Sequence, residues 1–291
     1  MLVGLSLCWG LTWPVLRIVL DELPPFSMRV ATSSLGALLM FTLAALQRRN
    51  VKLYGVARLH VAVAGSLNIA AFTLLTALGQ IGTLTSRVII LGYSMPIWAC
   101  LMAVPILGER IDRTRAVALV LCVAGVATMI APLAETAALP GLMFSLAAGV
   151  SWAAGTVYMK WAKIPGDPIA IAGWQLITAV VITCAALPVF EGSLHLWPMQ
   201  PRTMLALAFS GLIGSGLSYF LWFGAVRRLP AMTVSLGVLS VPVIGIAASA
   251  LMLGERPTVT DYIGCALILG AAACVLLAPA ARAANPAEPA V

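Results

Sequence analysis

Aromatic and polar side chains recur at helical spacing inside long apolar segments of this sequence. Tyr219 and Trp222 follow Ser215 at the i+4 and i+7 positions, so the three would share one helix face. Aromatic rings can hold an apolar body or, through cation–π attraction, an ammonium group, while hydroxyl and amide groups can hydrogen-bond a polar end. We therefore predict a substrate-binding site made by Trp9, Asn68, Tyr93, Trp98, Trp152, Thr156, Gln175, Ser215, Tyr219 and Trp222.

Some of the same residue types have structural interpretations. Tryptophan and tyrosine rings near the end of a membrane span more often lie at the lipid–water interface, and we expect this of Trp13 and Tyr158. Small residues such as Ser215 can instead permit close packing between helices.

Three arginines fall near the expected outer ends of apolar segments: Arg17, Arg29 and Arg87. We expect these side chains to reach out to the interface or to pair with Asp21 or Glu22. The alternative is that Arg87 offers its charge to a substrate carboxylate at the outer mouth of a cavity.

Every acidic residue falls at the end of an apolar segment, in a loop or in the tail. Proton-coupled carriers usually keep an ionisable carboxylate or histidine inside the membrane, so the sequence favours facilitated, gradient-driven movement of a solute. It contains no phosphate-binding loop of the Walker A type, so ATP hydrolysis is not expected.

The six cysteines lie in apolar segments without a Cys-x-x-Cys pair, and the chain has only two histidines. We therefore predict no metal site, no other cofactor and no enzymatic activity, since a membrane-embedded enzyme would need a cluster of such groups. The 17 basic residues are scattered singly or in pairs, so the net charge of +7 does not predict a nucleic-acid partner. The expected partners are a small-molecule substrate and the lipid bilayer, with the chain as a monomer or homodimer.

The composition indicates a membrane protein. Hydrophobic residues make up 62% of the chain and charged residues 9%, whereas soluble domains carry about 25% charged residues. A spanning helix needs about 20 mostly apolar residues. Turn and charge signals give ten predicted spans, at residues 2–20, 26–46, 59–79, 84–107, 115–132, 140–160, 168–189, 203–225, 231–253 and 261–278. The first lacks a preceding basic segment and a small-x-small cleavage site, which favours a span over a cleavable signal.

The chain contains an internal repeat. The segment from Pro96 to Arg110 recurs from Pro242 to Arg256 at an offset of 146 residues, and both copies end in Leu-Gly-Glu-Arg. Pro96 and Pro242 should kink their spans and are the predicted hinges. Each half has five spans, an odd number, so the second half would insert upside down, with a central cavity between the halves. The predicted units are 1–135 and 136–279, followed by a disordered tail at 280–291.

Basic residues are concentrated on one side of this predicted bundle. If the N-terminus is cytoplasmic, the cytoplasmic segments hold 12 of the 17, namely Arg48, Arg49, Lys52, Arg58, Arg110, Arg113, Arg115, Lys160, Lys163, Arg227, Arg228 and Arg282. The positive-inside rule therefore places both termini in the cytoplasm. We expect the membrane to be a bacterial-type inner membrane.

These features resemble the drug/metabolite transporter superfamily, and in particular its ten-helix EamA-type exporters. The likeness lies in Trp9-Gly10 and in the paired Leu-Gly-Glu-Arg ends, and it extends over essentially the whole chain; the second half departs from it at Trp152-Ala153. The resemblance implies export of small metabolites by alternating access, with neutral or aromatic amino acids favoured. The alternatives are a carrier for nucleotide sugars, sugar phosphates or quaternary amines, and a membrane subunit without a transport role. A nucleotide-sugar carrier would need several basic side chains around the phosphates, for which only Arg17 and Arg87 are candidates.

Overall fold

The structure is a computed structural model that describes residues 2–109, 111–222 and 231–277, without the side chains of residues 231–238 and 275–277. The predicted disordered tail at 280–291 lies outside these residues. The regular elements of the described part are α1 (Leu2–Leu20), α2 (Pro25–Leu46), α3 (Ala57–Gly65), η1 (Ser66–Ala71), α4 (Phe72–Gly82), α5 (Thr85–Gly92), α6 (Met95–Leu107), α7 (Arg113–Ile130), η2 (Ala131–Leu133), α8 (Leu139–Ala162), α9 (Pro168–Phe190), α10 (Pro201–Ala208), η3 (Phe209–Leu217), α12 (Ala231–Leu253) and α13 (Val259–Leu277).

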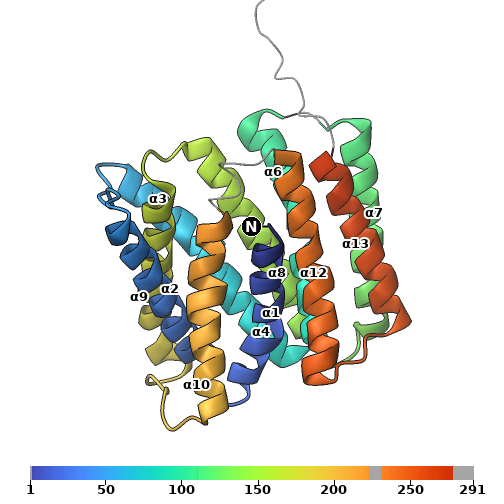
Figure 1. Cartoon of the computed structure of the whole chain (residues 1–291). Helices are drawn as coiled ribbons and strands as arrows, with labels where there is room; N and C mark the ends of the chain where they lie inside the picture. Colours follow the sequence, from blue (N-terminus) through green and yellow to red (C-terminus); the bar gives the residue numbers. More distant parts are fainter. Residues whose placement is uncertain (1, 110, 223–230, 278–291) are drawn as a thin grey trace, which may run out of the picture.

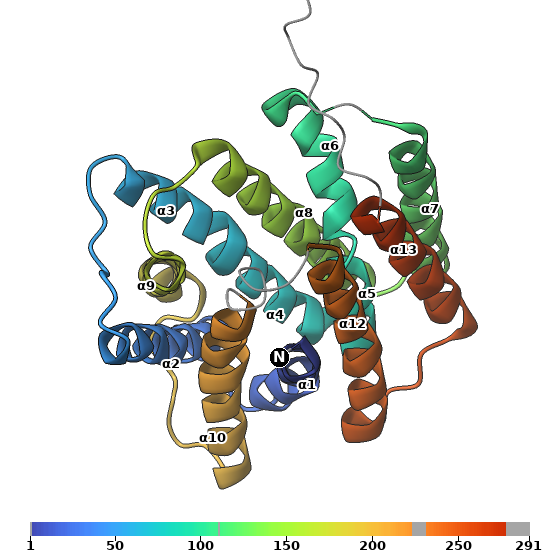
Figure 2. The same ribbon diagram turned by 45° about the horizontal axis from the view of Figure 1, so that its top comes forward.

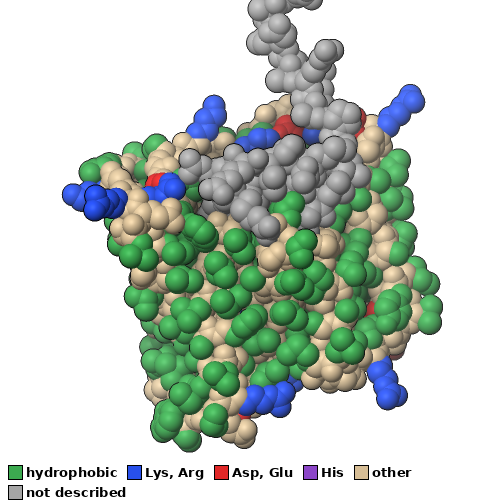
Figure 3. All heavy atoms as spheres, viewed as in Figure 1, with side chains coloured by type: hydrophobic (Ala, Val, Ile, Leu, Met, Phe, Trp, Pro, Cys, Tyr) green, Lys and Arg blue, Asp and Glu red, His purple; other side chains and the backbone are tan. Residues whose placement is uncertain are grey.

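These helices make up the ten predicted spans (Figure 1). Within the described residues, eight stretches are long and apolar enough to cross a membrane, and the shorter apolar stretches Leu239–Leu253 and Val259–Cys274 complete the ten. In Figure 3, apolar side chains cover the middle of the visible face, while the Lys and Arg side chains lie toward its two ends. A bilayer requires this distribution because charged side chains are costly in hydrocarbon. The predicted all-α membrane fold is confirmed.

The two halves pack as an inverted repeat. Equivalent helices meet in pairs, α2 with α9 and α7 with α13. The crosswise contacts are also reciprocal, because α1 packs on α12 just as α8 packs on α5 and α6. Figure 2 shows α1, α4, α8 and α12 in the middle, with α2 and α9 to one side and α7 and α13 to the other. Equivalent helices are five spans apart and so run in opposite directions, as a pseudo-two-fold axis in the membrane plane requires.

Two spans contain a π-helical segment at matching positions. In the third span, η1 joins α3 to α4, and in the eighth span η3 follows α10. These segments begin at Ser66 and Phe209. The number of residues between these two starts equals the number between Trp9 and Trp152, so the segments occupy equivalent positions in the two halves. A π-helical turn widens the helix and shifts the faces that follow it, and such turns are frequent at functional sites.

The fourth span is broken, whereas its counterpart is continuous. The helix stops after Gly92 and restarts at Met95, so Pro96 lies in the first turn of α6, where its missing N–H is not needed. Pro242 instead lies inside α12, which is helical throughout. A kink was predicted at both prolines, and the break just before Pro96 has no counterpart in α12, so the two halves differ at this point of the repeat. Both spans end at the predicted residues, 107 and 253, and each is followed by a glycine with positive φ, Gly108 or Gly254.

Glycines allow helix backbones of the two halves to approach closely. A Cβ atom on Gly141, in the first turn of α8, would lie 2.7 Å from the carbonyl carbon of Gly82 at the end of α4. Small residues at such crossings are typical of membrane helices, which gain stability from tight packing.

Gly141→Ala is therefore expected to destabilise the protein by at least about 1 kcal/mol, because backbone atoms cannot move aside as a flexible side chain can. The measurement is thermal unfolding of the purified protein in detergent. Gly4→Ala is the matched control, since a Cβ there would have nothing within 4 Å. Equal stability of the two variants would contradict the close contact between α4 and α8.

Candidate functional site

A cavity of about 110 Å³ lies between the two halves, in the region where the central helices meet. Its described lining residues are Trp9, Thr12, Trp13, Leu16, Arg29, Thr32, Ser33, Ile69, Phe72, Thr73, Thr76, Gly92, Tyr93, Met95, Trp152, Leu176, Gly214, Ser215 and Tyr219. Both π-helical segments and the break in the fourth span contribute to this lining. These three irregular points therefore converge on one cavity.

Aromatic rings form much of the cavity wall. The Trp9 ring lies 6.1 Å from Tyr219 in an edge-to-face arrangement. On another side, the Phe72 ring contacts Trp152 at 4.7 Å and Trp13 at 6.4 Å, again edge to face. These rings come from α1, α4, α8 and the residues after η3, so both halves build the wall. Such a surface suits an apolar or aromatic body, or a cation over a ring face.

Arg29 brings a positive charge to this wall. It lies in the second turn of α2, is 4% exposed, and donates a hydrogen bond from Nη2 to Thr76 Oγ1 at 3.2 Å. Its Nε has no hydrogen-bond partner. The prediction that this side chain reaches out to the interface is wrong, because α4, α9 and α10 pack around this end of α2. For Arg17 the predicted pair with Asp21 is confirmed, at 3.0 Å.

Five of the ten predicted site residues line the cavity: Trp9, Tyr93, Trp152, Ser215 and Tyr219. Trp222 is outside the described lining but adjacent to it, with its ring centroid 5.8 Å from that of Trp9.

The other four predicted residues lie outside the described cavity lining. Asn68 and Gln175 are buried together and both direct an amide nitrogen at the sulfur of Met159, at 3.7 and 3.2 Å. Trp98 donates from Nε1 to Ser94 Oγ at 2.9 Å. Thr156 is exposed and donates to its own helix, at the carbonyl of Trp152.

Sequence reasoning missed a polar stripe on α2. Arg29, Thr32 and Ser33 are spaced i, i+3 and i+4 and line the cavity together. That spacing was available in the sequence and would have indicated a shared helix face. Trp13, expected at the interface, also lines the cavity and contacts Phe72.

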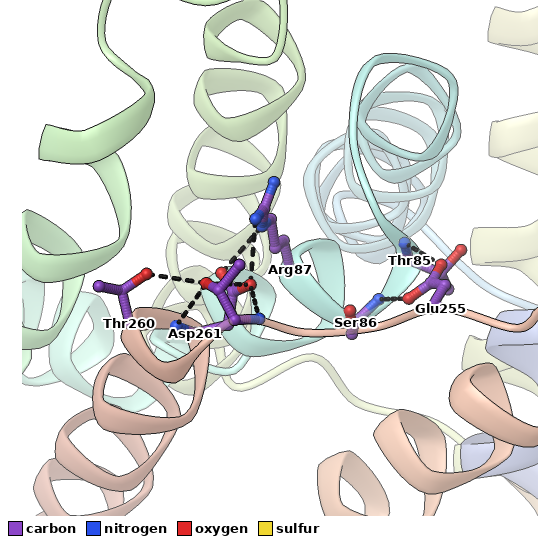
Figure 4. A network of polar contacts seen from close by, with 7 residues as sticks. Thr85, Ser86, Arg87, Glu255, Thr260 and Asp261 are labelled. Atoms are coloured by element: carbon purple, nitrogen blue, oxygen red, sulfur yellow. Dashed lines mark hydrogen bonds and ion pairs between the residues drawn. The ribbon is translucent and has the colours of Figure 1, made fainter.

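On the predicted outer side, charged groups join the two halves (Figure 4). Arg87 of α5 makes a two-pronged ion pair with Asp261 of α13, with Nε–Oδ1 and Nη2–Oδ2 distances of 2.8 and 3.0 Å. Glu255 accepts hydrogen bonds from the backbone N–H groups of Thr85 and Ser86 at 2.6 and 2.9 Å. Arg87 is thus engaged with a carboxylate of its own chain.

A second carboxylate also binds a helix start across the halves. Glu191 accepts the N–H groups of Phe26 and Ser27, at 2.6 and 2.9 Å, at the first turn of α2. The free N–H groups and the partial positive charge at a helix N-terminus favour an anion there. Glu191 and Glu255 therefore anchor the second half to helices α2 and α5 of the first.

On the predicted cytoplasmic side, ion pairs join the two halves, in place of carboxylates bound to helix N-termini of the other half. Glu109 pairs with Lys160 at 2.6 Å and with Arg115 at 3.3 Å, and the hydrogen bond from Lys160 holds the pKa of Glu109 below its ordinary value. Burial raises the pKa of Asp167, but hydrogen bonds from Arg49 and from the N–H of Ile169 outweigh it and leave the pKa lowered.

In the part of the chain that the structure describes, no group of three or more His, Cys, Asp or Glu side chains is placed to hold a metal ion.

Comparison with known proteins identifies the family. The model of the EamA-like transporter family matches residues 1–131 and 139–277, one match for each half. The chain belongs to the EamA-like transporter family. It is therefore a multi-pass membrane transporter, and the predicted likeness is confirmed.

Two relatives match nearly the whole chain. "Uncharacterized transporter YoaV" of Bacillus subtilis (strain 168) is 24% identical over 279 residues, which span 92% of each chain. "Probable amino-acid metabolite efflux pump" of Escherichia coli (strain K12) is 24% identical over 273 residues, 90% of this chain and 88% of the relative. A solved crystal structure with 21% identity superposes with a TM-score of 0.64 over 93% of this chain and 94% of its own, and shares the fold.

Proposed function

We propose that this EamA-family transporter exports small metabolites, with neutral or aromatic amino acids favoured. The observation that carries the proposal is the aromatic cavity built by both halves, with hydroxyl groups and one guanidinium among its walls. Its volume of about 110 Å³ is below the roughly 300–1,000 Å³ of pockets for drug-sized ligands, so a small metabolite suits it. The relative described as an amino-acid metabolite efflux pump supports the same substrate class.

The proposed mechanism is alternating access, in which the halves rock about the cavity. Pro96 and Pro242 are the proposed bending points, and the break beside Pro96 places Tyr93 directly in the cavity wall. The described lining holds no carboxylate or histidine, the groups that proton-coupled carriers use, so we propose facilitated movement down a gradient. From the distribution of basic residues, we propose a cytoplasmic-membrane location with both termini inside.

A nucleotide-sugar or sugar-phosphate carrier is the second candidate substrate class, and the cavity does not favour it. Phosphate groups would draw on several basic side chains, whereas Arg29 is the one basic residue among the described lining residues.

The proposal predicts saturable flux of an amino acid such as phenylalanine into liposomes that hold the purified full chain. The same assay should include sugar phosphates and quaternary amines. Saturable flux of one of these solutes, with none for any amino acid, would overturn the substrate class.

Trp152→Ala is expected to reduce that flux by about tenfold or more, because truncating an aromatic anchor in the wall of a binding site commonly weakens binding by 2 kcal/mol or more. Thermal unfolding of the same preparation separates this loss from a loss of fold. Trp161→Ala is the matched control, since Trp161 lies on the same helix but is 53% exposed and outside the cavity lining. Equal flux in the two variants would remove Trp152 from the site.

A further inference from the structure

Arg29 has no counterion in the described structure. Its Nη2 donates a hydrogen bond to the neutral Thr76, and its Nε is buried without a partner. A guanidinium keeps its charge at any physiological pH, so it cannot lower the cost of burial by losing a proton. A buried, unpaired charge is unfavourable, and an ionisable group inside a membrane span commonly marks a substrate pathway.

The described acidic residues near this end of the bundle are already engaged elsewhere. Glu191 binds the start of α2, Glu255 binds the start of α5, and Asp261 pairs with Arg87. Asp21 pairs with Arg17, and Glu22 accepts the N–H of Gln200. The cation in the cavity wall is therefore positioned for an anion that comes from outside the chain.

The chemistry of the cavity narrows the class of that anion. A guanidinium fits a carboxylate through two parallel hydrogen bonds, and Nε is free to supply one of them. The neighbouring rings of Trp13 and Phe72 offer an apolar surface. Because the described lining contains no acidic side chain, a substrate amino group would find no carboxylate to pair with there.

We infer that Arg29 binds the carboxylate of the substrate, and that the transported class is defined by a carboxylate on a small apolar or aromatic body, with no amino group required. This rests on the proposed transport function and names its substrate class more closely. It predicts that an aromatic carboxylic acid without an amine competes with the amino acid, whereas an aromatic amine without a carboxylate does not.

The test is a binding titration of the purified full-length protein, followed by tryptophan fluorescence, with 3-phenylpropionate, phenylalanine and 2-phenylethylamine. The two carboxylates are expected to bind about 10- to 100-fold more tightly than the amine, as charge-assisted hydrogen bonds imply. Arg29→Gln should remove this preference by weakening both carboxylates, and Arg29→Lys should keep part of it. Arg17→Gln, which removes a partly exposed arginine outside the cavity lining, should change neither affinity.

Thermal unfolding provides a readout that a merely structural arginine would not give. Arg29→Gln removes an uncompensated buried charge and is expected to leave the unfolding temperature unchanged or raised. A lowered unfolding temperature with unchanged carboxylate affinity would assign Arg29 to the fold and overturn the inference.

The remaining outcomes separate the inference from the proposed function. Tight, Arg29-dependent carboxylate binding without phenylalanine flux in liposomes would support the inference and overturn amino-acid export. Phenylalanine flux with equal affinity for 2-phenylethylamine and 3-phenylpropionate would overturn the inference alone. If neither 3-phenylpropionate nor phenylalanine binds, the inference is also overturned.

Discussion

Replacing Asp261 by asparagine is expected to destabilise the protein by about 3–5 kcal/mol, because it leaves the Arg87 charge buried without a partner. The two side chains are only 1% and 11% exposed, and both oxygens of Asp261 face the guanidinium. Asp261 also accepts the N–H and hydroxyl of Thr258 at 2.8 and 2.9 Å, which completes its hydrogen bonds at the start of α13.

Thermal and denaturant unfolding of the purified protein would measure this loss. Asp21→Asn is the matched control, since its pair with Arg17 is 60% and 33% exposed and should contribute about 1 kcal/mol or less. Replacing both partners, as Arg87→Met with Asp261→Leu, should recover most of the stability because neither charge remains buried. Similar losses for Asp21→Asn and Asp261→Asn would show that burial does not set the strength of the α5–α13 pair.

The spans and the repeat could be predicted because each depends on one property of a short segment. Twenty apolar residues fit the bilayer wherever they pack, so the predicted span 2–20 matches α1 (Leu2–Leu20). The two Leu-Gly-Glu-Arg ends could be recognised directly because the same four residues occur twice in the sequence, and their glycines have the positive φ that ends a helix. The π-helical segments could not be predicted, because widening a helix by part of a turn leaves the hydropathy of the span unchanged.

The position of a residue within its predicted span did not indicate whether neighbouring helices bury its side chain. Arg29 is only the fifth residue of α2, yet neighbouring helices bury it against the cavity. Trp13 and Tyr158 both looked like interface rings, but Trp13 faces the cavity whereas Tyr158 hydrogen-bonds His60. Asn68 and Gln175 were predicted to bind substrate, but both are buried outside the described cavity lining, with their amide nitrogens directed at the sulfur of Met159. Such outcomes depend on contacts between distant segments.

The two copies of the Leu-Gly-Glu-Arg motif also acquire different partners. Glu109 faces the basic side chains of Lys160 and Arg115, whereas Glu255 faces the backbone N–H groups at the start of α5. Counting charges would assign the greater stabilising role to Glu109. Solvent exposure weakens the shorter of these pairs, because the Lys160 side chain is 67% exposed. The pair with Arg115 is more buried, at 12% and 26% exposure, but longer, at 3.3 Å, whereas Glu255 makes two short contacts to backbone N–H groups.

Glu255→Ala is accordingly expected to destabilise the protein by about 1.5–3 kcal/mol, since it removes two charge-assisted hydrogen bonds and the anion at the N-terminus of α5. Glu109→Ala, the matched control at the equivalent position, should lose less, about 1 kcal/mol, because its short pair is with the exposed Lys160. Unfolding in detergent at low and at high salt would compare them. The Glu109 contribution should fall with salt, whereas that of Glu255, made by short contacts to backbone N–H groups, should persist. A larger loss for Glu109→Ala would mean that the ion pairs, and not the helix start, hold the two halves together.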